Sequence, residues 1–204
     1  LLLNSSFLDN IGIMHGKMGI AIFFFHLARM TKNTFYYTYA SELIDEIYGS
    51  VYKGTGIDFE NGLAGIGFGI EYLVQNGFIE ADTDEVLANI DERIFEGLVI
   101  DIPEDINILS GLIGYGAYYF MRLKNSHCTN RIIKITNQKA LNLIITEIEK
   151  KIDKKLGIFG EQLQFDIVTN YFTLIWFISE VQKYKFCKTT DNFIEKIKMI
   201  TKLR

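Results

Sequence analysis

Long apolar stretches alternate along the chain with charged, amphipathic ones. The charged stretches cover residues 36–48, 83–98, 137–155 and 191–203, and within them apolar residues recur at three- and four-residue spacings. This spacing is typical of helices with one face in water. The intervening stretches are more uniformly apolar, as expected of helices surrounded by other helices. The pattern predicts an all-α fold in which inner and outer helices alternate.

Short polar segments separate these predicted helices. They lie near residues 31–33, 49–56, 76–82, 97–105, 125–130 and 157–160. The chain contains a single proline, which favours long helices over short strands and turns. We expect four inner–outer helical hairpins in succession, which together form one domain over residues 1–204.

The apolar stretches share a repeated motif, in which a polar residue is followed by Gly-x-x-Gly and a long apolar helix. The three copies are NIGIMHGKMGIAIFFFHLAR, DFENGLAGIGFGIEYLVQNGF and DINILSGLIGYGAYYFMRL. Their glycine pairs are Gly16 and Gly19, Gly62 and Gly65, and Gly111 and Gly114. The first glycines are separated by 46 and 49 residues, the length of a helical hairpin with its loops. The repeat predicts an α-solenoid or a toroid.

A degraded fourth copy is predicted at QFDIVTNYFTLIWFISEV. In this alignment Asn170 and Thr173 occupy the two glycine positions. Asp166 then stands four residues before Asn170, as Asp58 stands four residues before Gly62.

The recurring glycines require a physical explanation, because glycine inside a helix costs about 1 kcal/mol relative to alanine. We expect them to permit the close approach of a neighbouring helix. Asn61 and Ser110, directly before two of the first glycines, are predicted N-caps. Inner-helix N-termini gathered at one mouth would present unpaired N–H groups, which suit an anionic or carbonyl-rich ligand.

At these residues the sequence resembles the lanthionine synthetase C-like family, the α/α toroids that include lantibiotic cyclases. The resemblance is carried by MHGKMGIAIF at 14–23, NGLAGIGFGIEYL at 61–73 and SGLIGYGAYYF at 110–120. The family fold implies a ring of seven hairpins, so four hairpins resemble a partial or truncated member. The chain begins Leu-Leu-Leu rather than with methionine, and we allow for residues before it.

The resemblance also implies a chemistry. Lantibiotic cyclases join a cysteine thiol to a dehydroamino acid of a peptide, with a zinc ion held by two cysteines and the histidine of a Cys-His-Gly element. The nearest element here is Met14-His15-Gly16, and a thioether is a poor zinc ligand beside a thiolate. The ligand set is not reproduced by the other candidates, His127, Cys128 and Cys187. We therefore expect no metal or cofactor in this chain, which would bind or help to modify a peptide.

Several polar residues are expected at the mouth where the inner helices begin. These candidate ligand-binding residues are His15, Asp58, Glu60, Asn61, Glu71, Asp105, Ser110 and Asp166. Glu71 lies within an otherwise apolar helix, so its carboxylate must be paired, protonated or open to a central cavity.

Simpler structural roles compete with this interpretation. His15 could cap or pack at its helix start, and carboxylates ahead of a helix are favoured by its dipole alone. The aromatic runs 23–25 and 118–120 fit a core as well as a peptide groove.

Two other functions stay open. One is a non-catalytic helical-repeat module that docks a partner chain. The other is a carbohydrate-active enzyme on a related toroid, in which paired carboxylates serve as acid and base. Stoichiometric zinc in the purified protein would favour a cyclase, and its absence would favour the module.

Composition excludes some partners and compartments. The net charge is −4, with 21 basic residues among 25 acidic ones, so we expect no nucleic-acid partner. The most apolar window, residues 11–28, is interrupted by His15, Lys17 and His26, so we expect no membrane span and no signal peptide. Cys128 and Cys187 are too few for a disulfide scaffold and lack CxxC spacing, which favours the cytoplasm.

An arc of four hairpins leaves the flanks of its first and last hairpins without neighbours. These flanks carry apolar side chains, among them Ile20, Phe24, Ile175 and Trp176. Exposed apolar patches mark interfaces. We expect association with a peptide or protein partner, or with another copy of the chain through these open edges.

Overall fold

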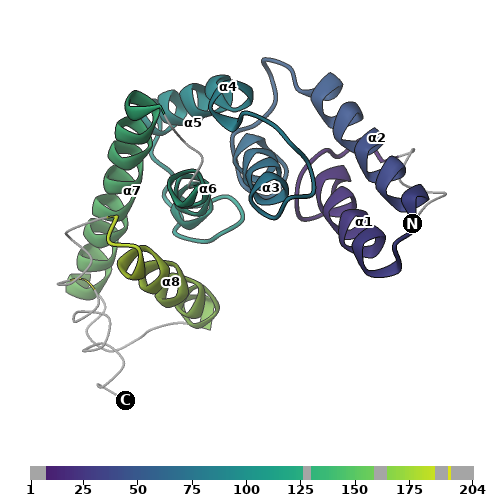
Figure 1. The fold of residues 1–204 in the computed structure, drawn as a ribbon. Helices are drawn as coiled ribbons and strands as arrows, with labels where there is room; N and C mark the ends of the chain where they lie inside the picture. Colours follow the sequence, from purple (N-terminus) through teal and green to yellow (C-terminus); the bar gives the residue numbers. More distant parts are fainter. Residues whose placement is uncertain (1–7, 126–129, 159–164, 187–192, 194–204) are drawn as a thin grey trace. The chain divides into compact units, whose positions relative to one another are not determined.

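A computed structural model describes residues 8–125, 130–158, 165–186 and 193, with the backbone alone between 154 and 171 (Figure 1). Over these residues the secondary structure is helical, with no strand. The helices are α1 (Lys17–Thr31), α2 (Thr34–Ser50), α3 (Leu63–Gln75), α4 (Thr83–Val86), α5 (Ala88–Ile100), α6 (Leu112–Lys124), α7 (Arg131–Ile158) and α8 (Phe165–Lys183). The prediction of an all-α fold is confirmed.

The chain divides into two compact units. Leu1–Asp101 holds α1 to α5, and Ile102–Arg204 holds α6 to α8. The expectation of a single domain over residues 1–204 stays a prediction.

In the first unit α1 and α2 form an antiparallel hairpin, and α1 also contacts α3 (Figure 1). The outer helix predicted over 83–98 is two helices, because α4 ends at Val86 and α5 begins at Ala88. The side chain of Asp82 accepts a hydrogen bond from the amide of Asp84 (3.0 Å) and so caps α4.

The core of the first unit lies between these helices. Its buried side chains include Met18, Phe24, Phe25, Ile47, Ile66 and Leu73. The ring of Phe24 packs edge-on against Tyr39 at 4.9 Å, and Phe25 packs edge-on against Tyr37 at 5.3 Å. The prediction that Phe24 lies on an open flank is therefore wrong, because this ring faces the outer helix α2.

In the second unit α6 packs against both α7 and α8. Every residue of α6 from Leu112 to Leu123 is buried, as predicted for an inner helix. Gly116 makes room for the ring of Phe177 from α8. Tyr118, Tyr119 and Phe120 are all buried, so this aromatic run belongs to the core.

The fourth copy of the repeat differs from its predicted register. Helix α8 begins at Phe165, so Asn170 lies inside the helix and not one residue before it. The outer helix predicted over 191–203 falls outside the described residues except for Phe193, which is buried.

The three clear copies behave as predicted at their starts. Gly16, Gly62 and Gly111 are the N-cap residues of α1, α3 and α6. The first glycine of each motif therefore marks the start of an inner helix.

Candidate functional site

At the starts of α1, α3 and α6, the preceding loop folds back and its carbonyl oxygens accept hydrogen bonds from the first helical amides. The amides of Lys17, Leu63 and Leu112 donate to carbonyl oxygens of Asn10 (2.9 Å), Gly56 (2.8 Å) and Asp105 (3.0 Å). In every copy the acceptor stands six residues before the first glycine. In α3 and α6 the next amide is also bonded, because Ala64 donates to Ile57 and Ile113 donates to Ile106, both at 3.3 Å.

The glycines provide the space that this folded-back loop needs. A Cβ at Gly16, Gly62 or Gly111 would lie within 3 Å of backbone atoms of its own preceding loop. A Cβ at the second glycines, Gly19 and Gly65, would overlap the carbonyl oxygens of Ile13 and Phe59. The first glycines have negative φ values that any residue adopts, so absence of a side chain is what matters.

This arrangement corrects the predicted role of the motif. The loop, rather than a neighbouring helix, lies against five of the motif glycines. A close helix approach occurs instead at Gly69 of α3, where a Cβ would meet the sulfur of Met18 from α1. The sixth motif glycine, Gly114, is buried in α6, and its amide donates to the carbonyl of Gly111 (3.1 Å).

The predicted N-caps at Asn61 and Ser110 are wrong. The capping residues are the glycines themselves, and no side chain caps these helices. Asn61 accepts from the side chain of Asn10 (2.6 Å), and the amide of Ser110 donates to the side chain of Asn107 (2.9 Å). Loop carbonyls hold the first amide of α1 and the first two amides of α3 and α6, so these amides are not available to an anion.

The loops of the first two copies lie against each other within the first unit. The amides of Ile13 and Met14 donate to the carbonyl oxygen of Glu60 (3.1 and 3.2 Å). A Cβ at Gly12 would overlap the backbone of Asn61. This contact brings together four predicted site residues, His15, Asp58, Glu60 and Asn61.

The four residues have different roles. Nε2 of His15 lies 3.6 Å from Oε1 of Glu60, and the His15 side chain is 73% exposed against 28% for Glu60. Asp58 is half-buried, and its Oδ1 accepts from the amide of Asn61 (2.8 Å), which stabilises the loop. Of the three titratable groups, the imidazole of His15 is the most exposed, while Asp58 and Glu60 are both partly buried.

A shallow apolar groove lies beside this pair. It has a volume of about 420 Å3 and is lined by Ile13, Met14, His15, Gly16, Gly19, Ile20 and Phe23. We call it the α1 groove. Phe23 is 49% exposed and packs edge-on against the buried ring of Phe24 at 5.3 Å, so its outer face is available.

Glu71 occupies a different environment from the one expected. It is fully buried in α3, and its Oε1 accepts from Nε2 of Gln75 (3.0 Å) one helical turn away. The alternative in which its carboxylate opens to a cavity is wrong in this structure.

The other predicted mouth residues belong to the second unit. Asp105 and Ser110 are exposed, and the carbonyl of Asp105 closes the start of α6. Asp166 lies within α8, and its side chain falls outside the described residues, as do His127, Cys128 and Cys187.

Two arginines that the sequence analysis did not single out hold the loops of the first unit. Arg29 donates to the carbonyls of Asn76 (2.7 Å) and Gly77 (3.2 Å) and stacks on the ring of Phe78 at 3.5 Å. Arg93 donates to three carbonyls of the loop after α2, at Tyr52, Lys53 and Thr55. Both arginines line hollows, but their guanidinium groups serve the structure.

Among the residues that the structure describes, the donor set does not fit zinc. Over the described residues no group of three or more His, Cys, Asp or Glu side chains is placed to hold a metal ion. His15 has one carboxylate beside it, and Nε2 of His26 is hydrogen-bonded to the hydroxyl of Tyr72 (2.8 Å).

The fold and the helix starts, whose first amides are bonded to the preceding loop, define the class of protein. It is an all-α protein of repeated helical hairpins in which α1, α3 and α6 begin after a glycine. The sequence model for lanthionine synthetase C-like protein matches residues 8–197, most of the chain. The chain belongs to the lanthionine synthetase C-like family. No curated protein and no solved structure matches it.

None of the helices that the structure describes combines the length and apolar character needed to cross a membrane.

Proposed function

We propose that this chain binds a peptide in the α1 groove and does not form thioethers by itself. The observation that carries the proposal is a shallow apolar groove directly beside an exposed imidazole and a partly buried carboxylate. Family membership supports it, since lanthionine is a cross-link formed within peptides.

The groove and its rim offer both kinds of contact that an extended peptide uses. An apolar side chain would pack against Ile20 and Phe23, while the His15–Glu60 pair would bond the peptide backbone. A carboxylate accepts from a backbone N–H, and an imidazole can donate or accept. The volume of the groove lies at the lower end of known small-ligand sites.

The charge of the ligand also follows from the geometry. Loop carbonyls occupy the first amides of α1 and α3, and Glu60 adds a negative charge at the rim. An anionic group would meet no unpaired first amide at these starts and would be repelled by the carboxylate. A neutral or cationic peptide is therefore favoured.

The first test is a peptide selection with a matched pair of variants. Peptides selected from a random dodecapeptide phage library on the immobilised chain are synthesised and titrated by fluorescence polarisation. Phe23→Asp is expected to weaken their binding at least about tenfold, because it removes an anchor and places a charge in the groove. Phe35→Asp is the control, since Phe35 is 58% exposed on α2 and lies outside the groove.

Peptides bound equally by both variants would contradict the proposal. So would a selection that yields only acidic sequences, because the rim of the α1 groove carries a carboxylate.

The second prediction concerns zinc. We expect purified protein to hold well below one equivalent of zinc and to leave the thiol intact in a synthetic peptide with one cysteine and one dehydroalanine. The physical reason is that Met14 stands where a thiolate is needed. Metal is measured by plasma mass spectrometry and free thiol by alkylation, because ring closure leaves the peptide mass unchanged.

One equivalent of zinc that is lost on replacing His127 or Cys128, together with consumption of the thiol, would overturn this prediction. Zinc-free protein that still consumes the thiol would refute the second half of the proposal and leave peptide binding untouched.

A further inference from the structure

Charge is distributed unevenly between the two units. Residues 1–101 carry 15 acidic and 5 basic side chains, a formal net charge of −10. Residues 102–204 carry 16 basic and 10 acidic side chains, a net charge of +6, so the overall −4 conceals two units of opposite sign. The basic residues are therefore mixed among the acidic ones in unequal proportions in the two units.

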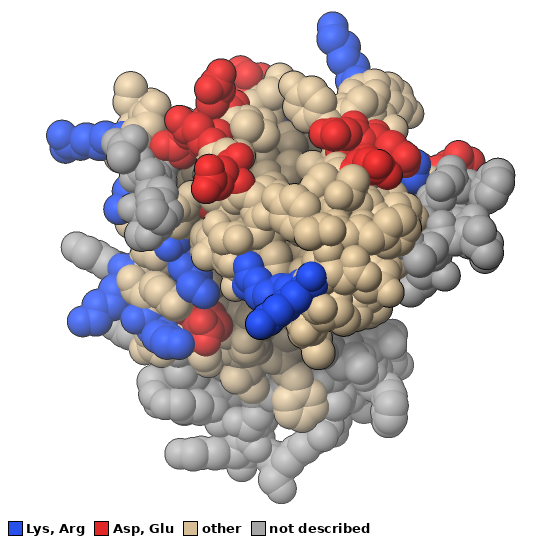
Figure 2. Space-filling model, turned by 45° about the vertical axis from the view of Figure 1, so that its right-hand side comes forward, with Lys and Arg blue, Asp and Glu red and all other residues tan. Residues whose placement is uncertain are grey.

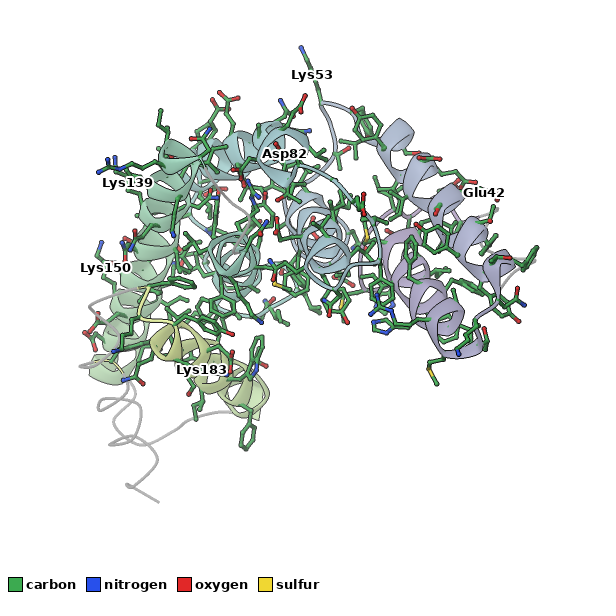
Figure 3. The ribbon with its side chains drawn as sticks, in the orientation of Figure 1. Glu42, Lys53, Asp82, Lys139, Lys150 and Lys183 are labelled. Atoms are coloured by element: carbon green, nitrogen blue, oxygen red, sulfur yellow. The ribbon has the colours of Figure 1, made fainter. Side chains whose placement is uncertain are left out.

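The acidic charge of the first unit includes the outer face of α2. This helix contains no lysine or arginine, and Glu42 and Asp45 are exposed on it. Glu42 is labelled in Figure 3, and Figure 2 shows acidic side chains in red patches on the face that it draws. Tyr48, 77% exposed, follows one turn later. Burial raises the pKa of Tyr39 on the same helix, and the charges of Glu46 and Glu42 raise it further. We call Glu42, Asp45 and Tyr48 the α2 face.

The basic charge of the second unit includes the start of α7. From 131 to 146 this helix has no acidic residue, and Arg131, Lys134 and Lys139 are exposed. Ile132, 75% exposed, and Ile135 lie among them. Figure 3 shows Lys139 on the side of α7 that points away from α6. We call these five residues the α7 face.

Neither face is neutralised within the described part of the chain. Lys17 pairs with Glu46 (2.6 Å), but Glu42 and Asp45 have no salt bridge there. Arg131, Lys134 and Lys139 likewise have none among the described residues. Both helices turn their apolar side inward, α2 through Leu43 and Ile47 and α7 through positions such as Ile144, so these charges point outward.

We propose that the α7 face of one chain docks on the α2 face of a second copy. The two faces are opposite in sign, and each follows one helix for about two turns. The α7 face exposes Ile132 and Ile135 among its charges, and the α2 face exposes Tyr48 beside its charges. Such a contact buries Ile132 and Tyr48 while opposite charges set its register.

A second copy of the chain fits the α7 face better than a polyanionic partner does. A polyanion such as nucleic acid would be attracted by the second unit but repelled by the −10 of the first. A second copy supplies an acidic and a basic face at once. Because the two faces differ, the contact is heterologous and can repeat from copy to copy.

The test is sedimentation velocity of the full chain over a wide range of concentrations. At about 20 mM salt we expect species that grow with concentration, and at about 500 mM salt an association constant at least about tenfold lower, because screening shortens the reach of charges. K134E/K139E and, separately, E42K/D45K are each expected to sediment as monomers, with unchanged far-UV circular dichroism.

Variants that restore opposite charges on the two faces distinguish a specific contact from a general effect of net charge on association. The fourfold variant E42K/D45K/K134E/K139E, which has exchanged the signs of the two faces, is expected to associate again. A mixture of the two double variants should also associate. K53E/K183E is the control, because it changes net charge as much as K134E/K139E does at exposed lysines outside both faces (Figure 3).

Three results would overturn the proposal: a wild-type monomer at every concentration in low salt, a fourfold variant that stays monomeric, or loss of association in K53E/K183E. Binding of duplex DNA that K134E/K139E abolishes, without self-association of the wild type, would assign the α7 face to nucleic acid instead.

Discussion

Gly65→Ala is expected to lower the free energy of unfolding by about 3 kcal/mol, as overpacking at a site without room to relax does. A Cβ at Gly65 would overlap the carbonyl oxygen of Phe59 and approach the side chain of Ile13 at 2.7 Å. The loop must then move away from the helix start, and the bonds from Leu63 and Ala64 to Gly56 and Ile57 are lost with it. The change is measured by guanidinium denaturation.

Gly49→Ala is the matched control. Gly49 lies in the last turn of α2, and nothing stands within 4 Å of its Cβ position. There we expect no loss, and a gain of up to about 1 kcal/mol from the higher helix propensity of alanine. Equal effects at both positions would contradict the account of the Gly-x-x-Gly motif as space for the loop.

The second large effect is expected for Phe25→Ala, with a loss of about 3–5 kcal/mol in the free energy of unfolding. Phe25 is fully buried, and its ring contacts Tyr37 and Phe78 at centroid distances of 5.3 and 5.8 Å. The substitution leaves a cavity where α1, α2 and the segment after α3 meet.

Phe23→Ala tests whether this loss comes from the site rather than from the substitution. It makes the same chemical change two residues earlier on the same helix, where half of the side chain is in solvent. We expect less than about 1 kcal/mol there. A loss as large as that at Phe25 would show that the α1 groove is part of the core and not a binding surface.

The sequence predicted the order of inner and outer helices because periodicity reports which face of a helix is buried. It placed Gly16, Gly62 and Gly111 at the helix starts, and the structure has them there. It could not predict that the loop folds back, since the acceptors are backbone carbonyls at Asn10 and Gly56 that any residue type supplies.

Other differences have similar causes. Three consecutive phenylalanines at 23–25 point about 100° apart around a helix, so composition alone could not tell the exposed Phe23 from the buried Phe24. The fourth repeat lacks both glycines, and without them the start of α8 was predicted at the wrong residue. Arg29 and Arg93 bond carbonyls that lie far from them along the chain, which no local pattern reveals.

For the candidate site, the sequence correctly predicted which residues lie close together but not the role of each side chain. His15, Asp58, Glu60 and Asn61 do converge, but Asp58 and Asn61 form hydrogen bonds that hold the loops, while His15 and Glu60 lie 3.6 Å apart beside the groove. The groove itself was missed as a unit. Ile13, Ile20 and Phe23 line one groove because the loop that carries Ile13 folds back against the start of α1 at Gly16 and Gly19.

The most direct test of the central claim is photo-crosslinking of a selected peptide that carries benzoylphenylalanine in place of its apolar residue. Mass spectrometry then identifies the attachment points on the chain. Peptide binding in the α1 groove predicts attachment at residues 13–23, reduced in Phe23→Asp and unchanged in Phe35→Asp. Attachment mainly at α5 or α7, with equal yield in both variants, would contradict it.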